Sequence, residues 1–176
     1  MAPIVVIVGA PGAGKSSVGK RVAYGLSVPF ADSDSLVEKR AGKSVADVFV
    51  SDGEEAFRAM EFEEIQTALA DFTGVLSLGG GAVLDDRTRQ ALKDQRVVWL
   101  QVDLGSATQR VGMNSARPLL LGNVRSTMIT MLEERTPLYD EIADIRVDTS
   151  GRSLKEVVDD VLTGVQGALE VLDDRN

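Results

Sequence analysis

The sequence of 176 residues contains no cysteine and no histidine, and only 5% of its residues are aromatic. Without cysteine the chain forms no disulfide and has no thiolate nucleophile. Without histidine, a general base has to be a carboxylate, a lysine or a tyrosine. The commonest ligands of zinc are also missing, so a bound metal is expected to be Mg²⁺ held by oxygen atoms.

Long hydrophobic runs and an excess of positive charge are also missing. No apolar stretch is long enough to span a membrane, and no basic segment precedes the first apolar run, so we expect no membrane partner and no secretion signal. The formal net charge of −8 argues against nucleic acid as a partner. We therefore expect a cytoplasmic protein, and a monomer, because no heptad pattern indicates a partner chain.

The most informative motif occupies residues 9–16 and fits G-x-x-x-x-G-K-S/T. An apolar, β-branched run at residues 4–8 precedes it, and apolar residues at helical spacing follow it over residues 16–26. This context is typical of the phosphate-binding loop of nucleoside-triphosphate enzymes, in which backbone N–H groups surround the phosphates. The alternative is an ordinary glycine turn between a strand and a helix.

A phosphate-binding loop gives its residues separate roles. Lys15 is expected to reach the β- and γ-phosphates of ATP, and the Ser16 hydroxyl is expected to bind Mg²⁺. The predicted ATP contacts of the loop are Gly12, Ala13, Gly14, Lys15, Ser16 and Ser17.

Strand-like and helix-like segments alternate along the whole chain, which predicts an α/β fold: a parallel sheet covered on both faces. Strands are expected at residues 4–8, 29–31, 75–78, 97–102 and 145–147. Helices are expected at residues 16–26, 33–41, 52–72, 85–92, 106–112, 126–134 and 153–171. Residues 1–176 are expected to form one domain, in which residues 112–123 are a lid-like loop.

Polar clusters follow the strands at the edge where such sheets bind ligands. Asp32 and Asp34 come after the second expected strand, and one explanation is that Asp34 or Ser33 caps the next helix. Arg58 lies in a helical segment, where it can form an ordinary ion pair with Glu54.

Three consecutive glycines, Gly79, Gly80 and Gly81, follow the third strand. A tight turn needs fewer, so close approach of the backbone to a ligand explains them better. Arg117 lies in the lid-like loop and Arg135 at the expected end of a helix, and either alone is explained as a solvated charge.

Taken together, these clusters resemble the shikimate kinase family over nearly the whole chain. The resemblance consists of the phosphate-binding loop, D-x-D at residues 32–34, Arg58, the triple glycine, R-P-L-L at residues 117–120 and R-x-P-x-Y at residues 135–139. It implies a three-layer α/β/α P-loop kinase fold with a central five-stranded parallel sheet and a mobile lid. It also implies transfer of the ATP γ-phosphate to the 3-hydroxyl of shikimate, a step of aromatic amino-acid biosynthesis. Ser33 stands where the family often has threonine.

The resemblance also implies site residues, with a substrate-binding region at about residues 33–61. Arg58 and Arg135 would bind the substrate carboxylate. Helical spacing, and not the resemblance, suggests Glu61 as a partner that holds the Arg58 guanidinium in place, because it lies one turn beyond Arg58 on the same face. Asp34 would accept the proton of the attacking hydroxyl or orient that hydroxyl. The implied substrate-binding residues are Asp34, Arg58, Gly79, Gly80, Gly81 and Arg135.

The resemblance places one Mg²⁺ ion at Ser16 and, through water, at Asp32, with Ser77 as a further candidate. Asp103 competes with Asp32 for this role, although we expect Asp103 to start the next helix. Arg117 would act in catalysis by entering the site and neutralising the transferring phosphoryl group.

Arg110 is implied to lie against the adenine of ATP, and Arg152 on the other side of the adenine pocket. Residues 150–154 match the family pattern poorly. Two rival functions stay open: another small-molecule kinase, acting on gluconate or a nucleoside monophosphate, and a regulatory module that binds ATP without turnover.

Overall fold

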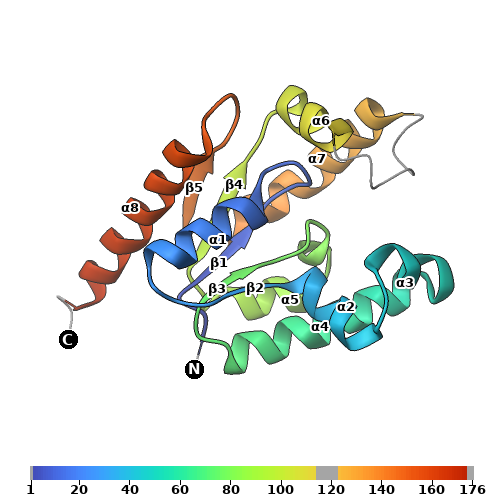
Figure 1. Cartoon of the computed structure of the whole chain (residues 1–176), viewed down its shortest axis with the longest axis horizontal. Coiled ribbons are helices and arrows are strands. Elements are labelled where there is room, and N and C mark those ends of the chain that lie inside the picture. The colour runs from blue at the N-terminus through green and yellow to red at the C-terminus, as the bar shows by residue number, and fades with distance from the viewer. Residues whose placement is uncertain (1, 114–122, 174–176) are drawn as a thin grey trace.

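Five short parallel strands form the centre of the computed structural model, which describes residues 2–113 and 123–173 (Figure 1). Their order across the sheet is β2-β3-β1-β4-β5. The strands are β1 (Val5–Val8), β2 (Phe30–Asp32), β3 (Val75–Ser77), β4 (Val97–Gln101) and β5 (Ile145–Asp148). Because β1 lies between β3 and β4 and is covered on both faces, all four of its residues are buried and apolar.

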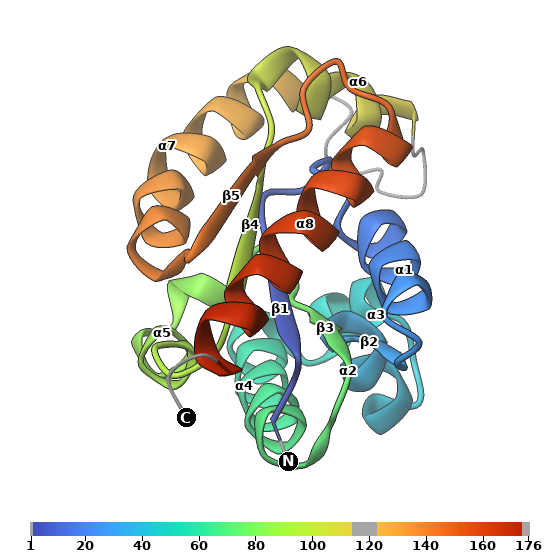
Figure 2. The same ribbon diagram turned by 90° about the vertical axis from the view of Figure 1, so that its left-hand side faces the viewer.

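Helices cover both faces of the sheet (Figure 2). On one face, α1 (Lys15–Gly25) and α8 (Leu154–Asp173) pack on a core that includes Val5 and Ile7. On the other, α4 (Gly53–Asp71), α5 (Asp86–Leu92) and α7 (Val124–Ile142) pack on a core that includes Val6 and Val8. Alternate residues of β1 therefore serve opposite cores, and the predicted three-layer fold with a five-stranded parallel sheet is confirmed.

Three helices form a smaller lobe beside β2. In it α2 (Ser33–Ala41), α3 (Val45–Ser51) and the first turns of α4 share a core of Val37, Val48 and Phe57. The sequence analysis missed α3, and it also missed the 3-10 turn η1 (Ala82–Leu84). Neither segment is long enough to show a helical period, and α3 begins at a local cap in which Ser44 Oγ accepts from the backbone N–H of Asp47.

The long helix α7 corrects a second expectation. The segment containing Arg135 was expected to end a helix, but α7 continues through Pro137 to Ile142. A proline inside a helix costs about 3 kcal/mol. Burial of Tyr139 and Ile142 in the core over the sheet favours continuation in spite of that cost.

The remaining helix, α6 (Leu104–Met113), packs on α7. Of the expected lid, residues 114–122 lie outside the described residues, and Arg117 is among them. In the part of the chain that the structure describes, no helix has both the length and the hydropathy of a membrane span.

The strand order brings the predicted motifs to one edge of the sheet. The phosphate-binding loop follows β1, the D-x-D follows β2 and the triple glycine follows β3. These three strands are neighbours, so their carboxyl ends lie side by side. Figure 1 shows α2 and α3 on one side of this edge and α6 on the other.

Candidate active site

The phosphate-binding loop joins β1 to α1 in a conformation that glycine favours. Gly12 and Gly14 have φ angles of 82° and 88°, and a Cβ on Gly12 would lie 2.9 Å from the carbonyl oxygen of Ala107. The Lys15 side chain donates a hydrogen bond of 3.2 Å to the carbonyl of Ala10 at the start of the loop. The first N–H groups of α1 have no carbonyl one turn earlier in the helix, so this end of α1 favours an anion.

A cavity of about 420 Å³ opens in front of this loop. Its lining combines the loop, the D-x-D and the triple glycine, which confirms that these motifs lie at one site. The lining residues are Pro11, Gly12, Gly14, Lys15, Ser16, Ser17, Asp32, Asp34, Leu78, Gly79, Gly80, Arg110 and Val111. Another cavity, of about 370 Å³, lies along α7 and is lined in part by Arg135.

Asp32 connects the start of α2 to the phosphate-binding loop. One carboxylate oxygen accepts from the Ser16 hydroxyl at 2.9 Å, and the other accepts from the backbone N–H of Asp34 at 3.0 Å. Asp32 is therefore the N-cap of α2, and the interpretation that Ser33 or Asp34 caps this helix is wrong. Asp34, one residue into the first turn, lines the cavity instead.

The triple glycine leaves space for charged side chains from three elements. A Cβ on Gly79 would lie 2.6 Å from Oδ1 of Asp34 and 2.7 Å from Oε1 of Glu61. A Cβ on Gly80 would lie 3.4 Å from Nη1 of Arg135, and one on Gly81 would overlap the guanidinium of Arg58. Asp34, Arg58 and Arg135 are charged residues expected to bind the substrate, and with Glu61 they lie close to where a Cβ on these glycines would be. We call the four the substrate cluster after this expectation.

Arg58 binds Glu61 more closely than Glu54. Its Nη1 lies 2.6 Å from Oε2 of Glu61, whereas its Nε lies 3.8 Å from Glu54. The expected Arg58–Glu61 contact is thus confirmed. Burial raises the pKa of Glu61, and the nearby Asp34 carboxylate adds to this effect while Arg58 opposes it. Within residues 2–113 and 123–173, the buried Oε1 atom of Glu61 has no hydrogen-bond partner.

Arg135 and Tyr139 lie one turn apart on α7 and face the same glycines. Burial raises the pKa of Tyr139 to about 12, so its hydroxyl stays protonated at neutral pH and donates to the carbonyl of Gly80 at 2.6 Å. The Nε atom of Arg135 is buried with no hydrogen-bond partner among the described residues. The sequence analysis placed Tyr139 in a motif without giving it a role, because its contact with Gly80 spans 59 residues.

Arg110 joins the phosphate-binding loop to the loop after β5. Its guanidinium donates to the carbonyl of Gly12 at 3.0 Å and to the carbonyl of Thr149 at 2.7 Å. Thr149, buried and bonded to Gln101 through its hydroxyl, has no motif that would reveal this role from sequence. Asp103 accepts from the backbone N–H of Ser106 in the first turn of α6, as expected of a residue that starts this helix.

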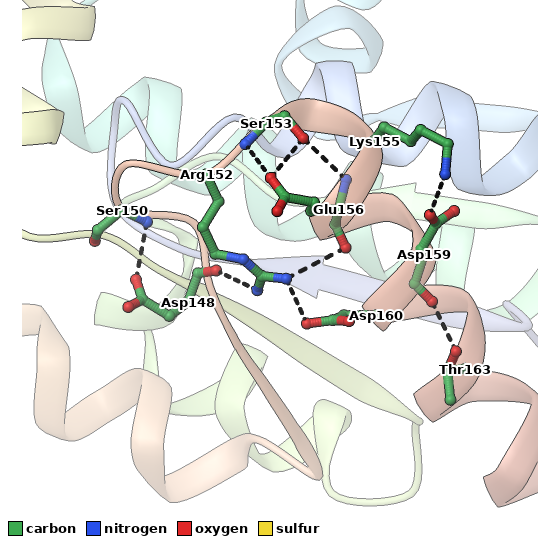
Figure 3. A network of polar contacts seen from close by, with 9 residues as sticks. All are labelled: Asp148, Ser150, Arg152, Ser153, Lys155, Glu156, Asp159, Asp160 and Thr163. Carbon is green, nitrogen blue, oxygen red and sulfur yellow. Dashed lines mark hydrogen bonds and ion pairs between the residues drawn. The ribbon is translucent and has the colours of Figure 1, made fainter.

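Arg152 lies in the loop between β5 and α8, away from the substrate cluster. Its guanidinium donates to the carbonyl of Asp148 at 3.0 Å and binds the carboxylate of Asp160 at 2.8 Å (Figure 3). Glu156 accepts from the Ser153 hydroxyl in the same network, and this bond lowers the pKa of Glu156. The ATP contact expected of Arg152 stays a prediction.

A parallel sheet of this order, with the phosphate-binding loop and a charged substrate cluster at its carboxyl edge, defines a P-loop kinase. A family model described as shikimate kinase matches residues 11–166. The chain belongs to the shikimate kinase family.

Individual relatives agree with this membership. The shikimate kinase of Thermobifida fusca is 48% identical over 157 residues, which cover 89% of this chain and 91% of the relative. The structure of a shikimate kinase from Acinetobacter baumannii in complex with shikimate superposes with a TM-score of 0.88 and 29% identity, covering 96% of this chain and 94% of the other. A gluconokinase from Sinorhizobium meliloti, at a TM-score of 0.64 and 21% identity, shares the fold alone, with coverage of 98% and 96%.

Proposed function

We propose that this protein transfers the γ-phosphoryl group of ATP to the 3-hydroxyl of shikimate, giving shikimate 3-phosphate and ADP. Its membership of the shikimate kinase family supports the reaction and both substrates. The observation that carries the proposal is the convergence of Asp34, Arg58 and Arg135 on the triple glycine, beside the phosphate-binding loop. The gluconokinase structure shares only its fold with this chain, and a shared fold does not determine which substrate an enzyme binds.

Arg58 and Arg135 are proposed to bind the carboxylate of shikimate. A guanidinium can meet a carboxylate through two parallel hydrogen bonds, which sets the orientation of the substrate as well as its affinity. Glu61 supports Arg58 by direct contact, and the Nε of Arg135 lacks a hydrogen-bond partner among the described residues. The backbone of Gly79, Gly80 and Gly81 is proposed to approach the substrate ring, since no side chain intervenes.

Asp34 is the proposed acceptor of the proton from the 3-hydroxyl. As the 3-oxygen forms its bond to the γ-phosphorus, the bond from that phosphorus to the β,γ-bridging oxygen breaks and ADP leaves. The carboxylate of Asp34 lines the cavity that also contains Lys15, so the proton acceptor and the phosphate-binding cation share one space. Lys15 would neutralise charge on the β- and γ-phosphates, and Arg117 is proposed to do so on the transferring group.

Oxygen atoms suited to Mg²⁺ lie beside the phosphate-binding loop. The Ser16 hydroxyl and the Asp32 carboxylate are in contact, and Asp32 pairs with Ser77 across β2 and β3. Within the described ranges, the buried Ser77 hydroxyl has no hydrogen-bond partner, which fits a polar group that meets a metal-bound water. We propose that Ser16 binds one Mg²⁺ directly and Asp32 binds it through water. The ion would neutralise phosphate charge when bound.

The nucleotide is proposed to extend from the phosphate-binding loop toward Arg110. Backbone groups from Gly12 to Ser17 would contact its phosphates, and the guanidinium of Arg110 would lie against adenine while its edge binds Gly12 and Thr149. Arg152 is proposed on the other side of the adenine pocket. We further propose a cytoplasmic monomer in which residues 1–176 form one domain, with a substrate-binding region at residues 33–61 and a lid at residues 112–123.

Release of ADP from Mg-ATP tests the function directly, with shikimate, gluconate, AMP and no acceptor run in parallel. Turnover with shikimate alone is expected. Turnover with only gluconate or AMP would keep the phosphate-binding loop and reject the carboxylate-binding roles of Arg58 and Arg135. ATP binding by a folded protein, without turnover on any acceptor, would favour the regulatory alternative.

A further inference from the structure

Ser33, between the two acids of the D-x-D, makes a buried contact with the triple glycine. It is the first residue of α2 and its side chain is fully buried. Its Oγ accepts a hydrogen bond of 2.8 Å from the backbone N–H of Gly79, which is 46 residues away in sequence. The roles given to the D-x-D above use Asp32 and Asp34 and leave this residue without a role.

The Ser33 hydroxyl accepts a hydrogen bond from the Gly79 N–H just beyond the end of strand β2. Strand β2 stops at Asp32, which pairs with Ser77, and the chain then turns into α2. Leu78 still donates to Ile7 of β1, but beside Gly79 the β2 chain is already helical. A buried N–H without a partner is costly, so Ser33 stabilises the first residue of the triple glycine in its observed place.

The position of Gly79 matters because two carboxylates lie against it. Its α-carbon leaves no room for a Cβ between Oδ1 of Asp34 and Oε1 of Glu61. Asp34 is the neighbour of Ser33 in the first turn of α2. The Ser33–Gly79 bond therefore joins the element that carries the proposed proton acceptor to the backbone proposed to approach the substrate.

Three consecutive residues at the start of α2 therefore each face a different part of the site. Asp32 accepts from Ser16 of the phosphate-binding loop, Ser33 accepts from Gly79, and Asp34 lines the cavity. We propose that the Ser33 hydroxyl is a positioning group that sets the spacing between Asp34 and the triple glycine, and thereby orients shikimate for phosphoryl transfer. This inference rests on the proposed function.

The test compares Ser33→Val and Ser33→Ala, which remove the hydroxyl, with Ser33→Thr, which retains it. Thr88→Val is the matched control, because Thr88 is equally buried but lies on α5 outside the cavity. We measure kcat and KM separately for shikimate and for ATP, and confirm folding by thermal unfolding. Loss of the acceptor is expected to lower kcat/KM for shikimate by about 10- to 100-fold, with KM for ATP within about twofold.

Ser33→Thr and Thr88→Val are expected to retain the wild-type values for shikimate. The inference is overturned if the folded Ser33→Val and Ser33→Ala enzymes keep wild-type kcat/KM, or if Ser33→Thr loses as much as they do. Equal losses for shikimate and ATP would also overturn it, because they indicate a general structural role. Should Ser33→Val not fold, Ser33→Ala decides. Absence of turnover by the wild-type protein would instead refute the proposed function, and this inference with it.

Discussion

Two arginines near the carboxyl edge of the sheet, Arg58 and Arg152, differ in whether the polar groups around them have hydrogen-bond partners. Arg58 binds Glu61, whose second carboxylate oxygen is buried without a partner among the described residues. Arg152 donates to backbone carbonyls and to Asp160 in an exposed network (Figure 3). Unsatisfied buried groups are costly, so the unpartnered atoms of Glu61 and Arg135 support the proposal that a ligand binds at the substrate cluster, whereas the loop after β5 is stabilised by its own hydrogen bonds.

Glycines show the same contrast. Gly81 leaves space for Arg58, since a Cβ there would overlap the guanidinium of Arg58 unless that side chain moved. Gly151 has open space around it but a φ of 64°, so it is required for its backbone conformation. A glycine at the substrate cluster thus accommodates a charged side chain, and a glycine in the loop after β5 forms a turn.

The largest effect is expected for Arg58→Ala. This change removes the proposed carboxylate-binding group and leaves Glu61 buried without its cation, so kcat/KM for shikimate should fall by about 10²-fold or more. Steady-state kinetics with shikimate varied at saturating ATP measures it. A fall of less than about threefold would contradict the role of Arg58.

A smaller but selective effect is expected when each glycine is replaced by alanine. Gly81→Ala should raise KM for shikimate by about tenfold because Arg58 is displaced, whereas Gly151→Ala should lower stability by about 1 kcal/mol through backbone strain and leave KM for shikimate unchanged. Kinetics and urea unfolding on both variants check the contrast. If Gly151→Ala also raised KM for shikimate, the substrate cluster and the loop after β5 would not be independent.

The stability contributions of Glu61, in the substrate cluster, and Glu156, at the start of α8, should also depend on pH in opposite directions. The pKa of Glu61 is raised above its usual 4.5, so the native state holds this proton more tightly and the stability contribution falls as pH rises from 4.5 through the folded value. The pKa of Glu156 is lowered from 4.5, so its contribution is present above that value and is lost as pH falls.

Relative to the wild type, Glu61→Gln should therefore gain stability as pH rises above 4.5, while Glu156→Gln should gain it as pH falls below 4.5 (at most about one proton linked in each case). Urea unfolding at several pH values measures both slopes. Parallel slopes would contradict the contrast between a buried and an exposed carboxylate.

The smallest effect is expected for Arg152→Ala. Exposed ion pairs contribute about 0.2–1 kcal/mol, so stability should fall slightly, and loss of the contact proposed with adenine should raise KM for ATP by about threefold. Measuring KM for ATP decides the adenine-pocket role predicted for this residue. An unchanged KM for ATP would contradict that role and leave Arg152 with its contacts to Asp148 and Asp160.

Much of the fold was predictable because its signals are local. The apolar β-branched run of β1 and the glycines after it determine a strand and a tight loop within a dozen residues. The helix through Pro137 was not predictable, since only burial of Tyr139 and Ile142 on the sheet offsets the cost of the proline. Helical spacing offered both Glu54 and Glu61 as partners of Arg58, and only the tertiary structure decided that Glu61 is the closer one.

The sequence by itself determined the class of enzyme: the phosphate-binding loop, the D-x-D, the triple glycine and the arginines appear in the right order, and each motif's chemistry depends on residue types at close spacing. Tertiary structure alone decided which groups meet. Ser33 with Gly79, Tyr139 with Gly80 and Arg110 with Thr149 join segments 39 to 59 residues apart. Such contacts arise because parallel strands distant in sequence end side by side, and no periodicity within one segment encodes them.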